Sequence, residues 1–261
     1  ELYIWSMIGQ KGRRNMYQLG HICRMYRNNP WNRPYEHRIE TLKNAKRMDR
    51  NTVAFIYPGF DSSTFRYRGY NISETLEYSM WWAGAYFQME DLPLLREDLH
   101  AVDVVVMIRC AWDDELEDFM SLARSRGVRL CYDVDDLVCH PKYMPQMIEA
   151  LGLDKGTEWN FWFGLTARHS MILNACDFMI VTNEYLAGHL KNDFGKPCYV
   201  IKNYLNWIQE DVSQQYFEEK ILLDAQKPFL IGYFSGSPTH KKDLMTAMPE
   251  LEEFLMAHEN A

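Results

Sequence analysis

The sequence lacks most of the features that assign a protein to a class at sight. Its six cysteines form no C-x-x-C pair and match no zinc spacing, so neither a zinc domain nor a dithiol redox site is expected. No apolar run approaches the ~18 residues that span a membrane, and no signal peptide is visible. The 28 Lys and Arg residues are outnumbered by 36 Asp and Glu, which disfavours a general nucleic-acid binder. The cysteines lie in or beside apolar runs, which predicts reduced thiols and a cytoplasmic protein.

From residue 51 onward, short apolar segments alternate with amphipathic ones. Strands are predicted over 52–58, 102–108, 128–134, 177–182, 197–203 and 227–236. Helices are predicted over 72–87, 113–127, 157–176, 183–195 and 241–258. Strands that are nearly all apolar and alternate with helices indicate a parallel sheet with helices on both faces, which is a Rossmann-like α/β fold.

Three regions are expected along the chain. Residues 1–50 are a basic helical extension, 51–205 a Rossmann-like domain, and 206–261 a crossing segment with the first strand and helix of a second, truncated domain. The chain begins without Met and ends where a helical pattern stops, so a fragment is expected. Two interpretations of residues 1–50 are open: a solvated extension, or a segment that docks on a partner or an anionic membrane, because basic residues interleave with Trp and Tyr.

Ligands of open parallel sheets bind beyond the carboxyl ends of the strands, so the residues that follow each predicted strand form the candidate site. The substrate-binding candidates at these positions are Arg66, Arg68, Arg109, His140, Asn183, Glu184 and Asn203. The arginines after the first strand either grip a phosphate or carboxylate or pair with acidic neighbours. Asn183 also stands where a helix N-cap is expected.

Three aspartates, Asp133, Asp135 and Asp136, follow one another closely at the end of the predicted strand 128–134. As hard oxygen ligands they would suit Mg²⁺ or Mn²⁺. As a proton acceptor, one of them would act as a catalytic base with His140 nearby. As loop acids they would cap a helix or pair with the arginines. Their place after a central strand favours a site over a surface turn.

A loop of small residues, SGSPTHKKD, follows the last predicted strand and leads into a helix. Backbone N–H groups and the positive end of the helix dipole would favour a pyrophosphate there. The spacing is not that of a Walker loop, and an ordinary strand-to-helix turn remains open. The donor-phosphate candidates are Ser235, Gly236, Ser237, His240, Lys241 and Lys242.

Five motifs together resemble the GT-B glycosyltransferases that build bacterial surface polysaccharides. They are FRYRGYNISETL (65–76), VRLCYDVDDLV (128–138), DFMIVTNEYLAGHL (177–190), YVIKNYLN (199–206) and IGYFSGSPTHKKDL (231–244). The resemblance implies an acceptor-side and a donor-side Rossmann-like domain. It also implies transfer of a sugar from a nucleotide diphosphate to a glycan or lipid-linked acceptor, without an obligatory metal or other cofactor. It gives the three aspartates a catalytic, acceptor-side role. If residues 1–50 contact a membrane, the cytoplasmic protein would lie at its inner face.

Two other functions remain open from the sequence. A degenerate transferase domain would act as a non-catalytic glycan-binding or scaffold module. A Mg²⁺-dependent phosphoryl-transfer enzyme would use the aspartates as metal ligands.

Overall fold

A single parallel sheet dominates the computed structural model, which describes residues 29–60, 63–151, 153, 156–222, 231–233 and 241–258. The strands are β1 (Asn51–Tyr57), β2 (Trp82–Gln88), β3 (Val104–Ile108), β4 (Arg129–Val134), β5 (Phe178–Val181) and β6 (Cys198–Val200). The helices are α1 (Tyr35–Arg47), α2 (Asn71–Leu76), α3 (Leu92–Glu97), α4 (Asp114–Ser125), α5 (Met144–Leu151), α6 (Thr157–Ala175), α7 (Glu184–Phe194), α8 (Trp207–Leu222) and α9 (Lys241–Ala257), with a π-helix (Arg66–Tyr70) before α2.

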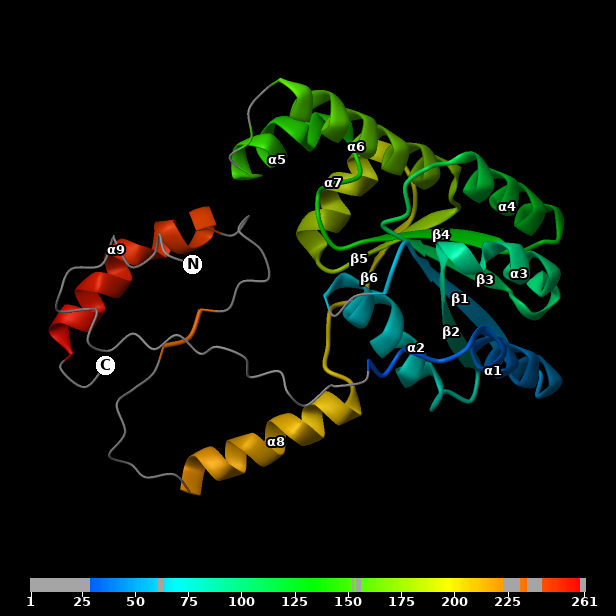
Figure 1. Ribbon diagram of the computed structural model, residues 1–261, viewed down its shortest axis with the longest axis horizontal. Coiled ribbons are helices and arrows are strands. Elements are labelled where there is room, and N and C mark those ends of the chain that lie inside the picture. The colour runs from blue at the N-terminus through cyan, green and yellow to red at the C-terminus, as the bar shows by residue number, and fades with distance from the viewer. Residues whose placement is uncertain are drawn as a thin grey trace. The chain divides into compact units, whose positions relative to one another are not determined.

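The strands lie in the order β2-β1-β3-β4-β5-β6, and every neighbouring pair is parallel. Alternate residues of each strand face opposite sides, and both sides are buried. Ile56 and Met107 belong to an apolar cluster that includes residues of α1, α3, α4, α6 and α7, whereas Phe55 and Val106 belong to one with residues of the π-helix, α2 and Trp31. Helices therefore cover the two faces of the sheet, and the predicted Rossmann-like α/β fold is confirmed (Figure 1).

The region expected to be a helix over 72–87 is a short helix, a turn and a strand, so that prediction was wrong. Helix α2 ends at Leu76, and the Ser79 hydroxyl accepts hydrogen bonds from the N–H groups of Trp81 (3.2 Å) and Trp82 (3.1 Å), where β2 begins. A short apolar run fits the helical and the strand period equally well. Packing decides between them here, because β2 lies buried between β1 and α2.

The compact unit that contains the sheet is Pro30–Val212, which differs from the boundaries expected at residues 50 and 205. Helix α1 belongs to this unit because Ile39 and Leu42 are part of its apolar core. The solvated extension expected over 1–50 is thus corrected for α1, and residues 1–28 lie outside the described residues. The second unit comprises Glu1–Asn29 and Ser213–Ala261. Of the strand expected over 227–236, residues 231–233 are described and are not in a strand.

No described helix is both long and apolar enough to cross a bilayer.

We expect Gly84→Ala to lower the free energy of unfolding by about 1–3 kcal/mol, because β2 has no room for a methyl group. A Cβ on Gly84 would lie 2.9 Å from Leu76 Cδ1 and 3.2 Å from the Ser73 backbone. Gly188, exposed within α7, meets nothing within 4 Å, so Gly188→Ala should instead stabilise by up to about 1 kcal/mol. Urea unfolding of both variants measures the difference. Equal changes of the same sign in the free energy of unfolding of the two variants would contradict the packing of β2 on α2.

Candidate functional site

The strand order places the topological switch of the sheet between β1 and β3, where the chain first turns to one side and then to the other. In open parallel sheets this is where ligands bind, beyond the carboxyl ends of the strands. The first residue after β3 is Arg109, whose φ of 48° lies in the left-handed region. A side chain other than glycine adopts this conformation at a cost of about 1–2 kcal/mol, which the surroundings must offset. The backbone N–H of Arg109 continues the β3–β4 pairing by donating to the Asp133 carbonyl at 3.0 Å.

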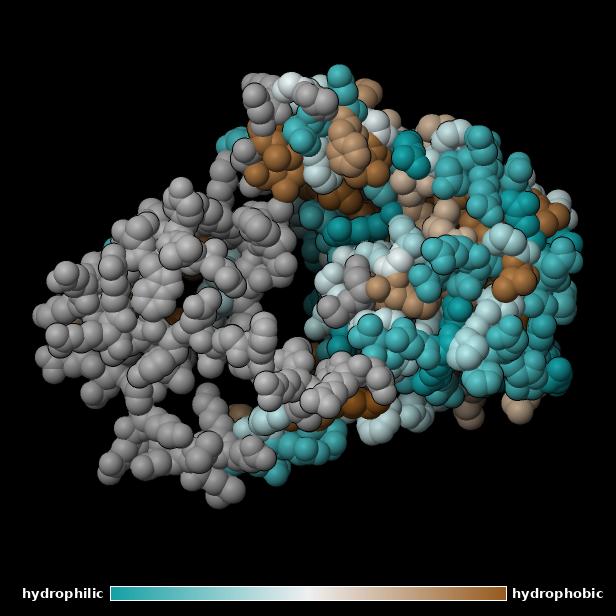
Figure 2. Space-filling view, in the orientation of Figure 1, coloured by the Kyte–Doolittle hydropathy of each residue, from teal (hydrophilic) through white to brown (hydrophobic). Residues whose placement is uncertain are grey.

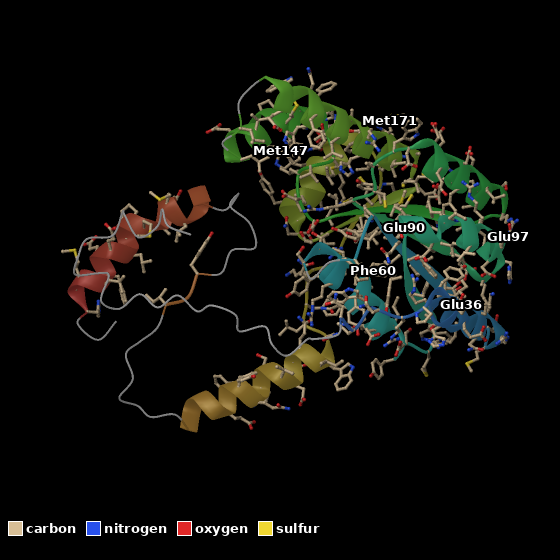
Figure 3. The ribbon with its side chains drawn as sticks, viewed as in Figure 1. Glu36, Phe60, Glu90, Glu97, Met147 and Met171 are labelled. Carbon is tan, nitrogen blue, oxygen red and sulfur yellow. The ribbon has the colours of Figure 1, made fainter. Side chains whose placement is uncertain are left out.

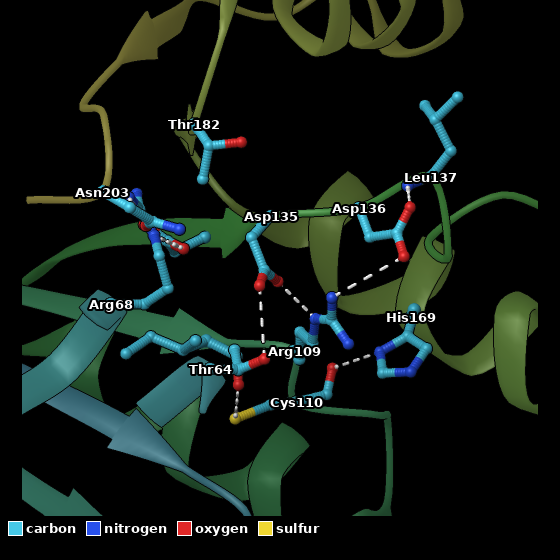
Figure 4. Close-up of polar contacts among 12 residues, drawn as sticks. Thr64, Arg68, Arg109, Cys110, Asp135, Asp136, Leu137, His169, Thr182 and Asn203 are labelled. Carbon is cyan, nitrogen blue, oxygen red and sulfur yellow. Dashed lines mark hydrogen bonds and ion pairs between the residues drawn. The ribbon is translucent and has the colours of Figure 1, made fainter. Parts of the chain in front are cut away.

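Arg109 and two of the three aspartates form a polar cluster at this edge (Figure 4). Arg109 Nε donates to Asp135 Oδ1, and Arg109 Nη2 lies 3.9 Å from Asp136 Oδ2. Thr64 completes the cluster by donating its hydroxyl to Asp135 Oδ2 at 3.2 Å. Burial alone would lower the pKa of Arg109, but the Asp135 carboxylate raises it above its ordinary value. The guanidinium therefore stays charged.

The three aspartates have very different exposures. The Asp133 side chain is 1% exposed, that of Asp135 16%, and that of Asp136 65%. Asp136 accepts a hydrogen bond from the N–H of Leu137 and keeps most of its carboxylate open to solvent. Of the three predicted catalytic acids, only Asp136 presents its carboxylate freely to a reactant.

Asp133 forms a buried ion pair with Arg68. Two parallel hydrogen bonds join them, Nε to Oδ1 at 2.8 Å and Nη2 to Oδ2 at 2.6 Å, and neither residue reaches solvent. Burial raises the pKa of the Asp133 carboxyl, and the Arg68 guanidinium opposes this shift. Because both oxygens accept hydrogen bonds from the guanidinium, we regard the pair as ionic at neutral pH. Asp133 was predicted to be catalytic and Arg68 to bind substrate, but the structure places both inside the protein, paired with each other and shielded from solvent.

The segment after β6 is held to the same π-helix and α2. Arg68 Nη1 donates to the Ile201 carbonyl at 2.6 Å and to Asn203 Oδ1 at 3.3 Å. Asn71, also buried, donates to the Tyr204 carbonyl at 2.9 Å and to Gln209 at 2.8 Å. Arg68 and Asn203, both predicted to bind substrate, therefore contact each other, with Asn203 accepting a hydrogen bond from the buried guanidinium.

The remaining predicted residues of the edge have local roles. Arg66 lies over the ring of Trp31, with its guanidinium carbon 5.8 Å from the centroid. His140 accepts a hydrogen bond from the Lys142 N–H at 3.1 Å, and its ring packs on Phe194 of α7 at 5.5 Å.

Asn183 caps α7, as the alternative interpretation held, by accepting from the Leu186 N–H at 2.9 Å. Glu184 is the exposed first residue of that helix.

Most of the donor-phosphate candidates lie in a segment that the structure does not describe. Ser235, Gly236, Ser237 and His240 lie outside the described residues, and Lys241 and Lys242 open α9. Among the described residues, no group of three or more His, Cys, Asp or Glu side chains could hold a metal ion.

Sequence reasoning missed the buried cluster of His169, Tyr132 and Cys110 beneath Arg109. His169 Nδ1 lies 2.8 Å from the Tyr132 hydroxyl and 3.2 Å from the Cys110 carbonyl, which joins α6 to the loop after β3. Burial lowers the pKa of His169 to about 4, so the imidazole is neutral in the folded protein. A lone histidine in a helix gives no sequence signal for this contact, since the two segments meet only in the fold.

The fold and the edge cluster define a Rossmann-like α/β protein with a charged centre at its topological switch. No family model matches the chain, and no curated protein matches it. Among solved structures, an ornithine transcarbamoylase from Giardia lamblia is similar over 64% of this chain and 64% of its own, with 12% sequence identity and a TM-score of 0.23. A likeness this slight says nothing of the site or the activity.

Removing one partner of the Arg68–Asp133 pair should destabilise the protein by about 3–5 kcal/mol, because it leaves an uncompensated buried charge. We expect this of Arg68→Met and of Asp133→Leu in urea unfolding. The double variant should lose much less than the sum of the two. Arg47→Met breaks the exposed ion pair with Glu40 and should cost less than about 1 kcal/mol. Additive losses would show that the pair is not coupled.

The stability of the protein should fall on acidification between pH 6.5 and 4 because of His169. The pKa of His169 in the folded protein is about 4, below its ordinary value of 6.5. Between these pH values the unfolded chain binds a proton at His169 that the folded protein does not bind. The expected loss is about 2–3 kcal/mol. His169→Gln should show a shallower slope of unfolding free energy against pH. A parental slope in His169→Gln would rule His169 out as the cause.

Proposed function

We propose that the chain forms the acceptor-side part of a glycosyltransferase, which transfers a sugar from a nucleotide-diphosphate-sugar to a glycan or lipid-linked acceptor. The proposal is supported by the resemblance of five ordered motifs to GT-B enzymes and by the Rossmann-like sheet. The observation that carries it is the open carboxylate of Asp136, held beside the Arg109–Asp135 pair at the switch-point edge.

Each member of the cluster has a distinct chemical part in this proposal. Asp136 accepts the proton that the acceptor hydroxyl loses, as its exposed carboxylate is the one best able to meet a reactant. Asp135 is fixed by Thr64 and Arg109, so it orients the guanidinium and the acceptor together. The buried Arg68–Asp133 pair sets the position of β4, from which both acids follow.

A non-catalytic glycan-binding module is the second candidate. It is favoured by one specific observation: Asp133 and Asp135 are both engaged by arginines, so two of the three acids are structurally committed. Such a module would bind a glycan at the same edge without releasing a nucleotide.

We expect the longest polypeptide that carries this sequence to release nucleotide diphosphate from a UDP-, GDP- or dTDP-sugar when a glycan acceptor is present. Because no obligatory metal is predicted, release should persist in EDTA. Asp136→Asn should lower turnover about 100-fold or more, as expected when a positioned base is lost. Asp118→Asn, an equally conservative change at an exposed position of α4, should leave turnover unchanged.

Full turnover by Asp136→Asn would remove this residue from the mechanism. Release only with Mn²⁺ would return the aspartates to the role of metal ligands. The absence of release from a folded, intact protein would favour the binding module.

A further inference from the structure

The turn at Arg109 is fastened to helix α6. With a φ of 48°, Arg109 has a backbone conformation that a residue other than glycine keeps only when its surroundings hold it there. Three residues further on, the Trp112 N–H donates to the Arg168 carbonyl at 3.1 Å, and Arg168 Nε donates to the Trp112 carbonyl at 2.6 Å. Between these points, the Cys110 carbonyl lies 3.2 Å from His169 Nδ1 (Figure 4). The peptide group that follows Arg109 is therefore in contact with a side chain of α6.

His169 belongs to the buried face of α6. Apolar side chains gather over α5 and α6 in the space-filling view, so hydrophobicity alone does not mark the face of α6 that packs on the sheet (Figure 2). The buried positions mark it, because they recur every three or four residues. They are Thr166, His169, Ile172 and Leu173. Met171 is 49% exposed and lies on another face of the helix, about 200° around the axis from His169 (Figure 3).

The contacts of His169 select one tautomer of its imidazole. Nδ1 lies 2.8 Å from the Tyr132 hydroxyl and 3.2 Å from the Cys110 carbonyl. A carbonyl oxygen only accepts hydrogen bonds, so an unprotonated Nδ1 would set two lone pairs against each other. With a proton on Nδ1, the imidazole donates to these oxygens, and the Tyr132 hydroxyl donates to the Cys110 carbonyl at 3.3 Å. The neutral Nδ1–H tautomer therefore satisfies the cluster.

The surroundings of His169 disfavour a second proton on the imidazole. Burial and the nearby cations Arg109 and Arg168 lower the pKa of His169, against the hydrogen bond to the Cys110 carbonyl. Tyr132 and the Cys110 thiol are its other titratable neighbours, and burial raises the pKa of both, so they stay neutral. A neutral hydrogen-bond donor thus lies beneath a charged guanidinium.

We infer that His169 is a positioning residue of the edge cluster: its neutral Nδ1–H group holds the Cys110 carbonyl and thereby keeps Arg109 in the turn from which the guanidinium reaches Asp135 and Asp136. His169 acts through Arg109 and touches no reactant. Both carboxylates pair with that guanidinium, so a shift of the turn moves the charge that neutralises them. The inference rests on the proposed function only where it concerns turnover, since the hold on the turn is independent of the reaction.

The first test uses the unaltered protein. NMR of the 15N-labelled imidazole distinguishes a protonated from an unprotonated ring nitrogen. At pH 7.5 we expect the His169 proton on Nδ1, with Nε2 unprotonated. A proton on Nε2 alone would overturn the inference, because Nδ1 could then not donate to the Cys110 carbonyl.

The second test compares two replacements of His169 by amide hydrogen exchange. His169→Leu removes the donor and keeps a side chain of similar size, whereas His169→Asn keeps a neutral N–H donor near the position of Nδ1. The Arg109 N–H, which donates to the Asp133 carbonyl, reports on the turn. Its exchange should quicken about fivefold to tenfold in His169→Leu, relative to amides of β5. In His169→Asn it should stay within about twofold of the parental rate.

Turnover in the nucleotide-release assay should follow the same order. His169→Leu should lower kcat about fivefold to tenfold with little change in KM, because the acids remain while their guanidinium is displaced. His169→Asn should recover most of the parental kcat. Met171→Ala, on another face of the same helix, should leave both the exchange at Arg109 and the turnover unchanged. Cooperative urea unfolding of each variant confirms that it folds.

Several results would overturn the inference. They are parental exchange at Arg109 in His169→Leu, equal quickening in Met171→Ala, no recovery in His169→Asn, or faster exchange in His169→Leu with parental kcat. The two proposals fail separately. Nucleotide release by a protein whose Arg109 exchange does not depend on His169 refutes only the inference. Exchange that depends on His169, in a protein that releases no nucleotide, refutes only the transferase.

Discussion

The buried ion pair between Arg68 and Asp133 is the constraint on which the edge of this sheet depends. It is made by residues 65 positions apart, one in a π-helix and one in the central strand β4. Two charges removed from water are stable only when their hydrogen bonds are satisfied, and Arg68 meets this condition by also bonding the chain after β6. One guanidinium thereby fixes three segments relative to one another.

The ion pair of Asp133 with Arg68 leaves the three aspartates in different environments. Asp133 is held inside the sheet, Asp135 is anchored by Arg109 and Thr64, and Asp136 faces solvent at the end of the same short run. Neighbouring carboxylates repel, and each arginine neutralises one of them. The result is one largely exposed carboxylate next to two that are held by hydrogen bonds to arginines.

The sequence was a good guide to the strands and a poor one to the partners of its charges. Continuous apolar runs such as VVVMI predicted buried parallel strands, because strands covered on both faces carry no polar alternation. Strand β2 was missed since its residues fit a helix as well. Without β2 the strand order was incomplete, so the switch point beside Arg109 could not be located. Whether an arginine binds a substrate or a buried carboxylate depends on contacts between distant segments. No spacing in the sequence encodes the meeting of Arg68 with Asp133 or of His169 with Tyr132.

The hydrogen bonds that hold residues 201–209 determine where a pulling force on the chain would act first. Strand β6 has only three residues and lies at the edge of the sheet, so by itself it would peel away under a small load. Arg68 and Asn71 donate hydrogen bonds to the backbone carbonyls just beyond β6, at Ile201 and Tyr204. Tension drawn through α8 therefore falls on the buried pair in the middle of the molecule before it reaches the edge strand.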